Sequence, residues 1–443
     1  MAKVIKLRKG LDINLKGKAT AEIAAVDCPG EYALVPDDFT GLKPKVVVRE
    51  GDAVKAGDAL FVDKLHPEVK FVSPVSGTVS QIERGDRRKL LAVKVNSDGK
   101  HEARSFDTKG DVRSLLLESG LFGFFRSRPY DVTANPEETP KAIFVSAFNS
   151  MPLAQDFEVA LKGQEKEFQT GLSTLAKLAK VYLGISVKEQ DNPALSGAKD
   201  CEVTVFDGPA PAGNVGVQIN HVNPINKGEV VWTLGAEEVI FVGRLMLTGQ
   251  VDFTRIMALA GSEVASPQYY KVMVGQKLTT LLNGRIQADG ARIINGNVMT
   301  GIKTSVEGYL AAHATEVNVI PEGDHADEFL GWIMPRFNMF STHRSYFSWL
   351  LGKQKEYILD ARVKGGERHM IMSGEYDKVF PMDIYAGYLV KAILTGDIDR
   401  QEALGIYEVA PEDFALAEFV DSSKLELQRI VREGLDILRK ENA

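Results

Sequence analysis

The spacing of hydrophobic and polar positions changes several times along the chain, and each change predicts a different kind of element. Between residues 45 and 95, short apolar runs such as Val46–Val48 and Ala59–Val62 are separated by turns such as Glu50-Gly51-Asp52. Short strands with glycine-acid turns at close spacing are typical of a compact all-β unit. We therefore predict a small β domain near the N-terminus.

The end of this unit resembles the flattened barrel of biotinyl and lipoyl carrier domains, on the strength of its turn spacing and of Ser73-Pro74-Val75-Ser76-Gly77. In those carriers, the lysine that bears the cargo stands at a hairpin tip, a fixed distance before the Ser-Pro pair. His66 occupies that position here, while Lys64 and Lys70 fall at other offsets. We interpret residues 1–100 as an N-terminal segment and a barrel-sandwich domain without a cargo lysine.

After a polar stretch over residues 96–110, short apolar strands alternate with segments of helical period. The expected elements are helices over 111–121, 172–180 and 236–248, and strands over 142–146, 181–185 and 203–206. This alternation predicts a Rossmann-like α/β domain over residues 101–260. Ligands of such sheets bind beyond the carboxyl ends of the strands. The loops Phe148–Pro152 and Asp207–Gly216 are expected there.

The last two regions differ from each other. Residues 261–330 combine strand-like runs with glycine turns such as Asn283-Gly284 and Asp289-Gly290, which predicts a small β-grasp-like domain. Residues 331–443 pass from an aromatic-rich segment into a helical tail that begins near Asp383. The expected fold class is therefore a multidomain α/β and α+β chain.

Composition narrows the function. The 443 residues carry 53 basic and 60 acidic side chains, so the net charge of −7 does not favour nucleic acid as a partner. Two distant cysteines, Cys28 and Cys201, argue against disulfide frameworks, four-cysteine zinc sites and cysteine-ligated iron–sulfur clusters. No secretory signal opens the chain, and the longest apolar run, Val239–Leu247, is interrupted by Arg244. We expect a chain that remains in the cytoplasm.

Local signatures of catalysis are missing from the sequence. GxGxxG after a strand, GxSxG and Cys-x-x-Cys do not occur, and the seven histidines are not spaced as helical zinc pairs. Gly296–Thr304 approaches a P-loop, but Ile302 separates its second glycine from Lys303, so we interpret it as a β-turn. The Gly208–Gly216 loop is interpreted as rigid rather than phosphate-binding. We predict no catalytic residue and no metal site.

Two clusters of aromatic and basic residues remain. The first is Phe122–Tyr130, and the second comprises Arg336–Phe340 and Arg344–Leu351. Such clusters fill a core, contact a partner or bind a flat ring with polar edges. For the first cluster all three interpretations stay open. In the second, Arg336, His343 and Arg344 interrupt the apolar face, which favours contact with a partner or near a membrane.

The order of these pieces resembles the A subunit of the sodium-translocating NADH:quinone reductase family over nearly the whole chain. The similarity is carried by Lys9–Ile13, the barrel segment through Gly77, the loop Gly208-Pro-Ala-Pro-Ala-Gly213 and the stretch Gly249–Gly261. More distantly, the layout is similar to the flavin-binding subunit of respiratory complex I and to the C subunit of the Rnf complex. Where those relatives hold flavin and cluster cysteines, this chain has Phe122–Tyr130 and a cysteine-free C-terminal region.

The resemblance implies a peripheral subunit on the cytoplasmic face of the bacterial inner membrane, with five partner subunits. It implies no covalent cofactor in this chain, since the flavins and the iron–sulfur centre belong to the partners. It also implies a contribution to the binding of a quinone, ubiquinone or menaquinone, and to assembly. The alternative is a scaffold subunit, with the quinone bound only by membrane subunits.

From these expectations we predict two groups of functional residues, one for quinone binding and one for contact with partner subunits. An apolar quinone ring needs aromatic walls, and its carbonyl oxygens need hydrogen-bond donors. The predicted quinone-binding residues are Phe124, Phe125, Arg126 and Tyr130. The predicted partner-contact residues are Phe337, Phe340, Tyr346 and Trp349.

Overall fold

The computed structural model describes residues 3–26, 30–324, 334–352 and 354–442. Its largest sheet has seven strands in the order β1-β14-β13-β12-β15-β10-β11. The first five strands run parallel to one another, and β10 and β11 add an antiparallel edge. Their bounds are β1 Lys3–Lys6, β10 Arg126–Arg128, β11 Val132–Thr133, β12 Ala142–Ser146, β13 Val181–Ser186, β14 Glu202–Asp207 and β15 Val231–Gly235. The predicted open α/β sheet is confirmed.

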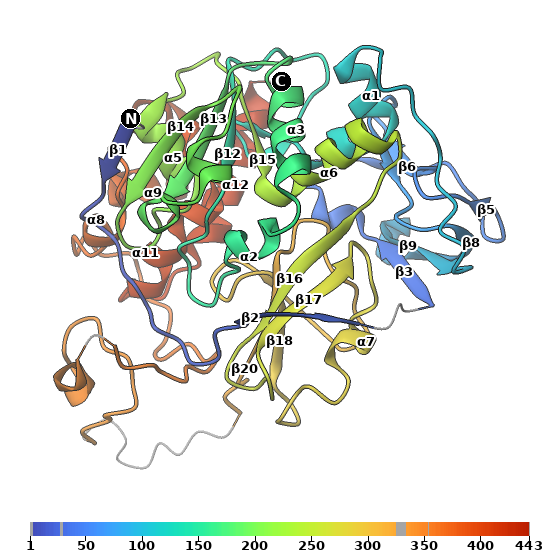
Figure 1. Ribbon diagram of the computed structural model, residues 1–443. Helices are drawn as coiled ribbons and strands as arrows, with labels where there is room; N and C mark the ends of the chain where they lie inside the picture. Colours follow the sequence, from blue (N-terminus) through green and yellow to red (C-terminus); the bar gives the residue numbers. More distant parts are fainter. Residues whose placement is uncertain (1–2, 27–29, 325–333, 353, 443) are drawn as a thin grey trace.

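Helices accompany this sheet (Figure 1). They are α1 Val112–Glu118, α2 Phe157–Leu161, α3 Glu165–Leu175, α4 Pro193–Ser196, α5 Val215–Val222 and α6 Ala236–Thr248. Glycine lets α3 and α6 approach closely, because a Cβ on Gly243 would lie 1.7 Å from the carbonyl oxygen of Glu167. The expected helix over 172–180 instead ends at Leu175. Residues 176–180 make the turn into β13, and Phe168, Leu172 and Leu175 are buried.

The predicted barrel consists of two small sheets. One has the order β3-β9-β8-β5 and the other β4-β6-β7. Their strands are β3 Glu31–Leu34, β4 Pro44–Val46, β5 Ala53–Val54, β6 Ala59–Asp63, β7 Lys70–Val72, β8 Gly77–Arg84 and β9 Leu90–Ser97. His66 lies in the hairpin between β6 and β7, where its carbonyl accepts a hydrogen bond from the Val69 amide.

A six-stranded sheet, β19-β18-β20-β16-β17-β2, lies below the barrel and the α/β sheet in Figure 1. Its strands are β2 Thr20–Ala25, β16 Thr254–Ala260, β17 Gln268–Met273, β18 Arg292–Asn295, β19 Ile302–Thr304 and β20 Glu316–Ile320, accompanied by α7 Leu278–Leu282. Apart from β2, the sheet begins at Thr254, before the expected boundary at residue 261. β16 completes it by pairing with both β17 and β20.

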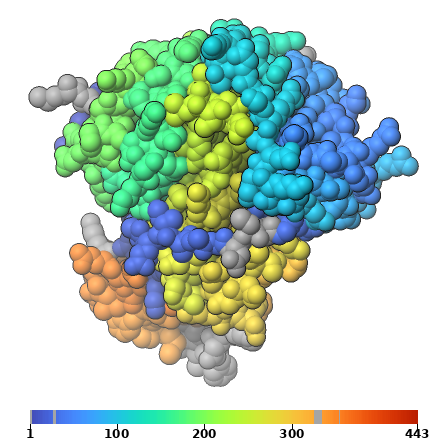
Figure 2. Space-filling model, turned by 45° about the vertical axis from the view of Figure 1, so that its right-hand side comes forward, coloured from blue at the N-terminus to red at the C-terminus, as the bar shows by residue number. Residues whose placement is uncertain are grey.

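The N-terminal segment also departs from the expected division. β1 pairs with β14 in the seven-stranded sheet, and β2 pairs with β17 in the six-stranded sheet. Figure 2 shows this segment, in dark blue, crossing the surface between the two regions. Residues 3–25 therefore join two domains that follow the barrel in the sequence.

The C-terminal region packs its helices against the α/β domain. They are α8 Tyr376–Val379, α9 Ala386–Leu394, α10 Ile398–Ala403, α11 Ala415–Val420 and α12 Leu427–Glu441. Between residues 334 and 375, the described chain is mostly irregular, with a short 3-10 helix at Phe347–Leu351. Of the helices that the structure describes, none combines the length and apolar character needed to cross a membrane.

Candidate functional site

The strand order indicates that a ligand site would lie at the carboxyl ends of the parallel strands of the α/β sheet. The chain leaves β12 toward β13 and β14, then returns to β15 on the other side of β12. Connections that leave neighbouring strands in opposite directions open a crevice at the carboxyl ends of those strands. Here the crevice lies beyond Ser146 of β12 and Gly235 of β15.

The two loops expected at this edge meet there. The Ser146 hydroxyl donates to the carbonyl oxygen of Gly213 at 2.8 Å, and the Gly213 amide donates to the Ser150 hydroxyl at 2.9 Å. A Cβ on Gly213 would lie 2.6 Å from the Ser150 amide nitrogen, so a larger side chain would push the loops apart. The predicted position of both loops is confirmed.

A cavity of about 520 Å³ opens at the crevice. All four regions of the chain form its walls, whose charged and aromatic side chains include Asp38, Phe124, Arg126, Arg128, Asp131, Glu237, Glu238, His313, Glu316, Glu412 and Arg432. Among the described residues that line it, seven carry carboxyl groups and three carry guanidinium groups. The lining is therefore acidic in composition, which disfavours a phosphate-bearing ligand and favours a neutral one.

Two lining residues, Glu237 and Glu238, belong to a buried group of charges. Both lie in the first turn of α6, where carboxylates interact favourably with the helix N-terminus. Arg255 of β16, 1% exposed, lies between them, with Nε 3.3 Å from Glu237 Oε2 and Nη2 3.0 Å from Glu238 Oε1. Gln155 Nε2 donates to Glu237 Oε1 at 2.9 Å. Burial outweighs the attraction of Arg255 and raises the pKa of Glu237 to about 7.

A second buried group joins the α/β domain to the C-terminal region. Arg128 is 1% exposed, and its Nη2 donates to Glu412 Oε1 at 2.9 Å. Its Nη1 lies 3.5 Å from Asp413 Oδ2, and its Nε lies 3.6 Å from Asp131 Oδ1. Burial raises the pKa of Glu412 to about 7, against the attraction of Arg128. Arg128 therefore binds the nearby Asp131 together with Glu412, which lies 284 residues away in sequence, and Asp413 beside it.

One end of the cavity has aromatic walls. The ring of Phe124 contacts His313 at 5.4 Å and Phe39 at 5.8 Å between centroids. Burial, with Arg126 and Arg255 nearby, lowers the pKa of His313 well below its ordinary value, so its imidazole is neutral at pH 7. Asp38, next to Phe39, accepts a 2.8 Å hydrogen bond from the Ala312 amide. An apolar ring could thus lie beside polar groups.

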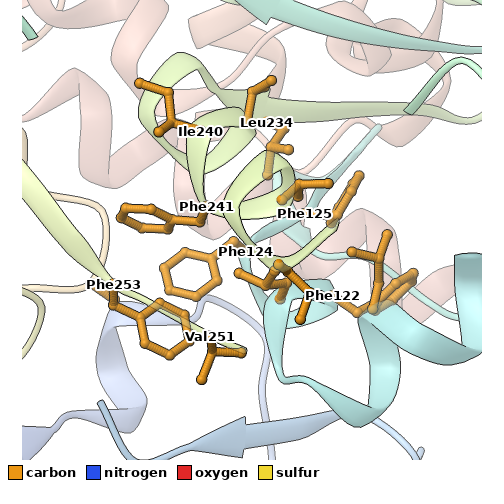
Figure 3. Packing of buried hydrophobic residues seen from close by; sticks show 14 of the residues in the cluster. Phe122, Phe124, Phe125, Leu234, Ile240, Phe241, Val251 and Phe253 are labelled. Carbon is orange, nitrogen blue, oxygen red and sulfur yellow. The ribbon is translucent and has the colours of Figure 1, made fainter. Parts of the chain in front are cut away.

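The structure separates the four predicted quinone-binding residues. Phe124 and Arg126 line the cavity, and the Arg126 side chain is 33% exposed. Phe125 is fully buried against Phe122 and Trp232, with ring centroids at 5.6 and 5.7 Å. Figure 3 shows Phe125 within the same buried cluster as Phe122 and Phe124. Tyr130 packs against Tyr407 at 6.5 Å, away from the cavity lining. The first cluster therefore divides between core and cavity wall.

The predicted partner-contact residues divide as well. Phe337 and Trp349 are exposed by 46% and 44%. Phe340 contacts Tyr357 and Phe419 within the chain, and Tyr346 lies beneath the guanidinium group of Arg336. We define the C-terminal apolar surface by its exposed large side chains, Met334, Phe337, Phe347, Trp349, Leu350 and Leu351.

Several cavity residues escaped the sequence reasoning. Asp38 belongs to the barrel domain, whereas Glu316 begins β20 of the six-stranded sheet and His313 lies just before it, and the three residues form no local motif. The acidic pair Glu237-Glu238 stands at the start of a helix expected after a strand. This position could have predicted that both residues lie near the ligand site. The segment compared with a P-loop connects β18 to β19, and Lys303 donates to Glu322 at 3.0 Å. Within the described residues, no three His, Cys, Asp or Glu side chains group as metal ligands.

Models of known protein families match three successive parts of the chain between residues 5 and 306. Residues 5–98 match the NqrA N-terminal barrel-sandwich hybrid domain, residues 107–251 the NqrA second alpha/beta domain, and residues 256–306 the NQRA C-terminal domain. A NAD+-reducing NiFe-hydrogenase chain of known structure is 14% identical, covering 42% of this chain and 41% of its own, but its TM-score of 0.32 is too low to carry an argument.

Curated relatives cover the chain almost completely. The A subunit of the Na(+)-translocating NADH-quinone reductase of Haemophilus influenzae strain PittGG is 34% identical over 99% of this chain and 100% of its own. The corresponding proteins of Yersinia pestis strain Angola and Pasteurella multocida are 35% identical at the same coverage. The chain therefore belongs to the NqrA family, the A subunits of the Na+-translocating NADH-quinone reductases.

Proposed function

We propose that this chain binds a quinone in the cavity beyond β12 and β15, and that it contributes to assembly of the reductase through the C-terminal apolar surface. As a family member, it is a subunit of a translocase that links NADH:quinone oxidoreduction to sodium transport. We place it at the cytoplasmic face of the bacterial inner membrane, held there by the five partner subunits. The flavins and the iron–sulfur centre are assigned to those partners.

The cavity carries the quinone proposal. Phe124 and His313 offer ring faces, and Arg126 offers guanidinium donors for a carbonyl oxygen. A quinone head group is neutral, so it avoids the repulsion that the acidic lining would exert on a phosphate. The cavity volume also lies within the usual range for small-molecule sites, roughly 300 to 1,000 Å³.

Replacing Arg126 with glutamine tests this site. We expect the affinity of the chain for a short-chain quinone to fall about tenfold or more, because a hydrogen bond from a charged donor contributes roughly 1.5–3 kcal/mol. Quenching of protein fluorescence measures the affinity. The exposed Arg87→Gln variant serves as a control and should bind as the unmodified chain does.

Photo-crosslinking gives a second readout of the same proposal. A photoreactive quinone analogue should label peptides that contain Phe124 or His313, and an excess of unlabelled quinone should compete. Labelling confined to other peptides, or equal affinity of the Arg126→Gln variant and the unmodified chain, would contradict the proposed site.

The C-terminal apolar surface favours the second candidate, a scaffold subunit with the quinone bound by membrane subunits. Phe347, Leu350 and Leu351 are 54%, 60% and 51% exposed, close to Phe337 and Trp349 in sequence. Clustered exposed apolar side chains mark interaction sites. Under this hypothesis, removal of the chain disrupts the complex while quinone labelling of the chain is absent.

Substituting alanine for both Trp349 and Leu350 tests assembly. We expect less of the variant to co-purify with the partner subunits, at least tenfold less at limiting concentration, because buried tryptophan commonly contributes about 2 kcal/mol or more to an interface. Its thermal unfolding should match that of the unmodified chain. Leu247→Ala, at an equally exposed position on α6, is the matched control and should assemble normally.

A further inference from the structure

Asp38 is the carboxyl group at the aromatic end of the cavity. It ends the short turn Pro36–Asp38 of the barrel domain, just before Phe39, whose ring contacts both Phe124 and His313. The Ala312 amide donates to its Oδ2 at 2.8 Å. Its Oδ1 has no hydrogen-bond partner among the described residues, and the side chain is partly exposed in the cavity lining. One carboxyl oxygen of Asp38 is therefore held by the Ala312 amide, and the other is free to bind a ligand in the cavity.

The surrounding groups suit an exchangeable proton at this position. Burial and the neighbouring Asp37 raise the pKa of Asp38 to about 6, partly offset by the Ala312 amide and by Arg126. Other titratable groups of the cavity lining include His313, held neutral by burial, and Glu238, whose Oε1 lies 3.8 Å from His313 Nδ1. A proton-transfer group works best when its pKa lies near the operating pH.

We propose that Asp38 donates a proton to a quinone oxygen when quinone is reduced in this cavity, where Arg126 also donates a hydrogen bond to the quinone. The proposal rests on the quinone function proposed above. It assigns a residue that neither the aromatic cluster nor any sequence motif identified.

Electrons and protons balance in this step. The quinone takes up two electrons, which originate from NADH and arrive through the partner subunits, and two protons. The O–H bond of the Asp38 carboxyl group breaks and an O–H bond forms on the quinone oxygen. The second proton comes from water in the cavity, and the resulting Asp38 carboxylate is reprotonated by water after the quinol leaves.

The test uses the assembled reductase and single-turnover quinone reduction. In the Asp38→Asn variant, the rate should fall about 100-fold at pH 6, within the range typical of general acid catalysis. Quinone affinity of the chain should stay within about threefold. In the unmodified enzyme the rate should decline as pH rises through about 6, since the acid form is lost, and this decline should vanish in Asp38→Asn.

Asp37 supplies the matched control. It is exposed and pairs with Lys89 Nζ at 2.6 Å. Asp37→Asn should keep the rate at low pH, and its decline should begin at slightly lower pH because a neighbouring negative charge is removed. Asp38→Glu should restore part of the rate and the decline with pH.

The outcomes separate the two proposals. Normal quinone labelling of the chain, together with an unchanged rate and pH profile in Asp38→Asn, overturns the role of Asp38 and leaves quinone binding intact. Absence of quinone labelling in the unmodified chain overturns both. A rate loss without any change in the pH profile shows that Asp38 has a structural role and also overturns the inference.

Discussion

Replacing Arg128 with methionine is expected to lower the free energy of unfolding by about 3–5 kcal/mol, the usual cost of removing one partner from a buried ion pair. The substitution leaves Asp131, Glu412 and Asp413 around an apolar side chain in the position where Arg128 is 1% exposed. Urea denaturation followed by circular dichroism measures the loss. The contact between β10 and the Pro411–Phe414 turn should be the first part to loosen.

The sign of the pH dependence provides a second check. Without Arg128, burial should raise the pKa of Glu412 and Asp413 further above their unfolded values, while Arg126 and Arg432 still face Asp131. Such groups favour the folded state at low pH and lose this contribution as pH rises through their folded pKa. The stability difference should therefore be larger at pH 8 than at pH 5. A difference that grows as pH falls would contradict this account.

Two further variants define the specificity of the effect. Adding Asp131→Asn and Asp413→Asn to Arg128→Met should recover part of the lost stability, because fewer unpaired charges remain buried. Arg429 on α12 also contacts two carboxylates, Glu426 and Glu433, but on the exposed surface. Arg429→Met should leave stability without measurable change.

Truncation of Phe125 to alanine should lower the free energy of unfolding by about 3–5 kcal/mol, as expected for removal of a fully buried aromatic ring. Its ring lies between Phe122 and Trp232, both fully buried. Thermal or urea unfolding measures the loss. Phe347→Ala, at a position 54% exposed, is the control and should change stability by less than about 0.5 kcal/mol.

A second variant at position 125 distinguishes a role of Phe125 in core packing from a role in quinone binding. Phe125→Leu keeps most of the side-chain volume, so the cost should stay below about 1.5 kcal/mol. Because Phe125 lies outside the cavity lining, this variant should bind quinone as the unmodified chain does. A large loss of quinone affinity in well-folded Phe125→Leu would show that the ring contacts the ligand.

The hydrophobic periodicity of the sequence correctly predicted elements that depend mainly on local sequence. β12 and α6 have the expected bounds, since an apolar run and a glycine-bounded amphipathic segment each specify one element. The two loops were placed correctly because the carboxyl ends of parallel strands share one edge. β2 was missed, because its partner β17 lies nearly 250 residues later.

The site was harder to predict than the sheet. Phe124 and Phe125 are adjacent in sequence, and which one faces the cavity depends on where the 3-10 turn Leu121–Phe124 ends and β10 begins. Asp38 and His313 meet Phe124 only after three domains have assembled. Arg128 stands in a recognisable cluster, but two of its three carboxyl partners, Glu412 and Asp413, come from a region more than 280 residues away.

The pairing of the N-terminal strands has a consequence for synthesis of the chain on the ribosome. β1 requires Thr204–Asp207, and β2 requires residues as late as Gln268–Lys271. At about 5–20 residues per second, β2 emerges on the order of 10 to 50 seconds before its partner strand is made. The barrel can close during that interval, whereas β1 and β2, which precede it in the chain, pair with their partner strands only later. Until then the exposed strand is a point where chaperones or a neighbouring nascent chain can act.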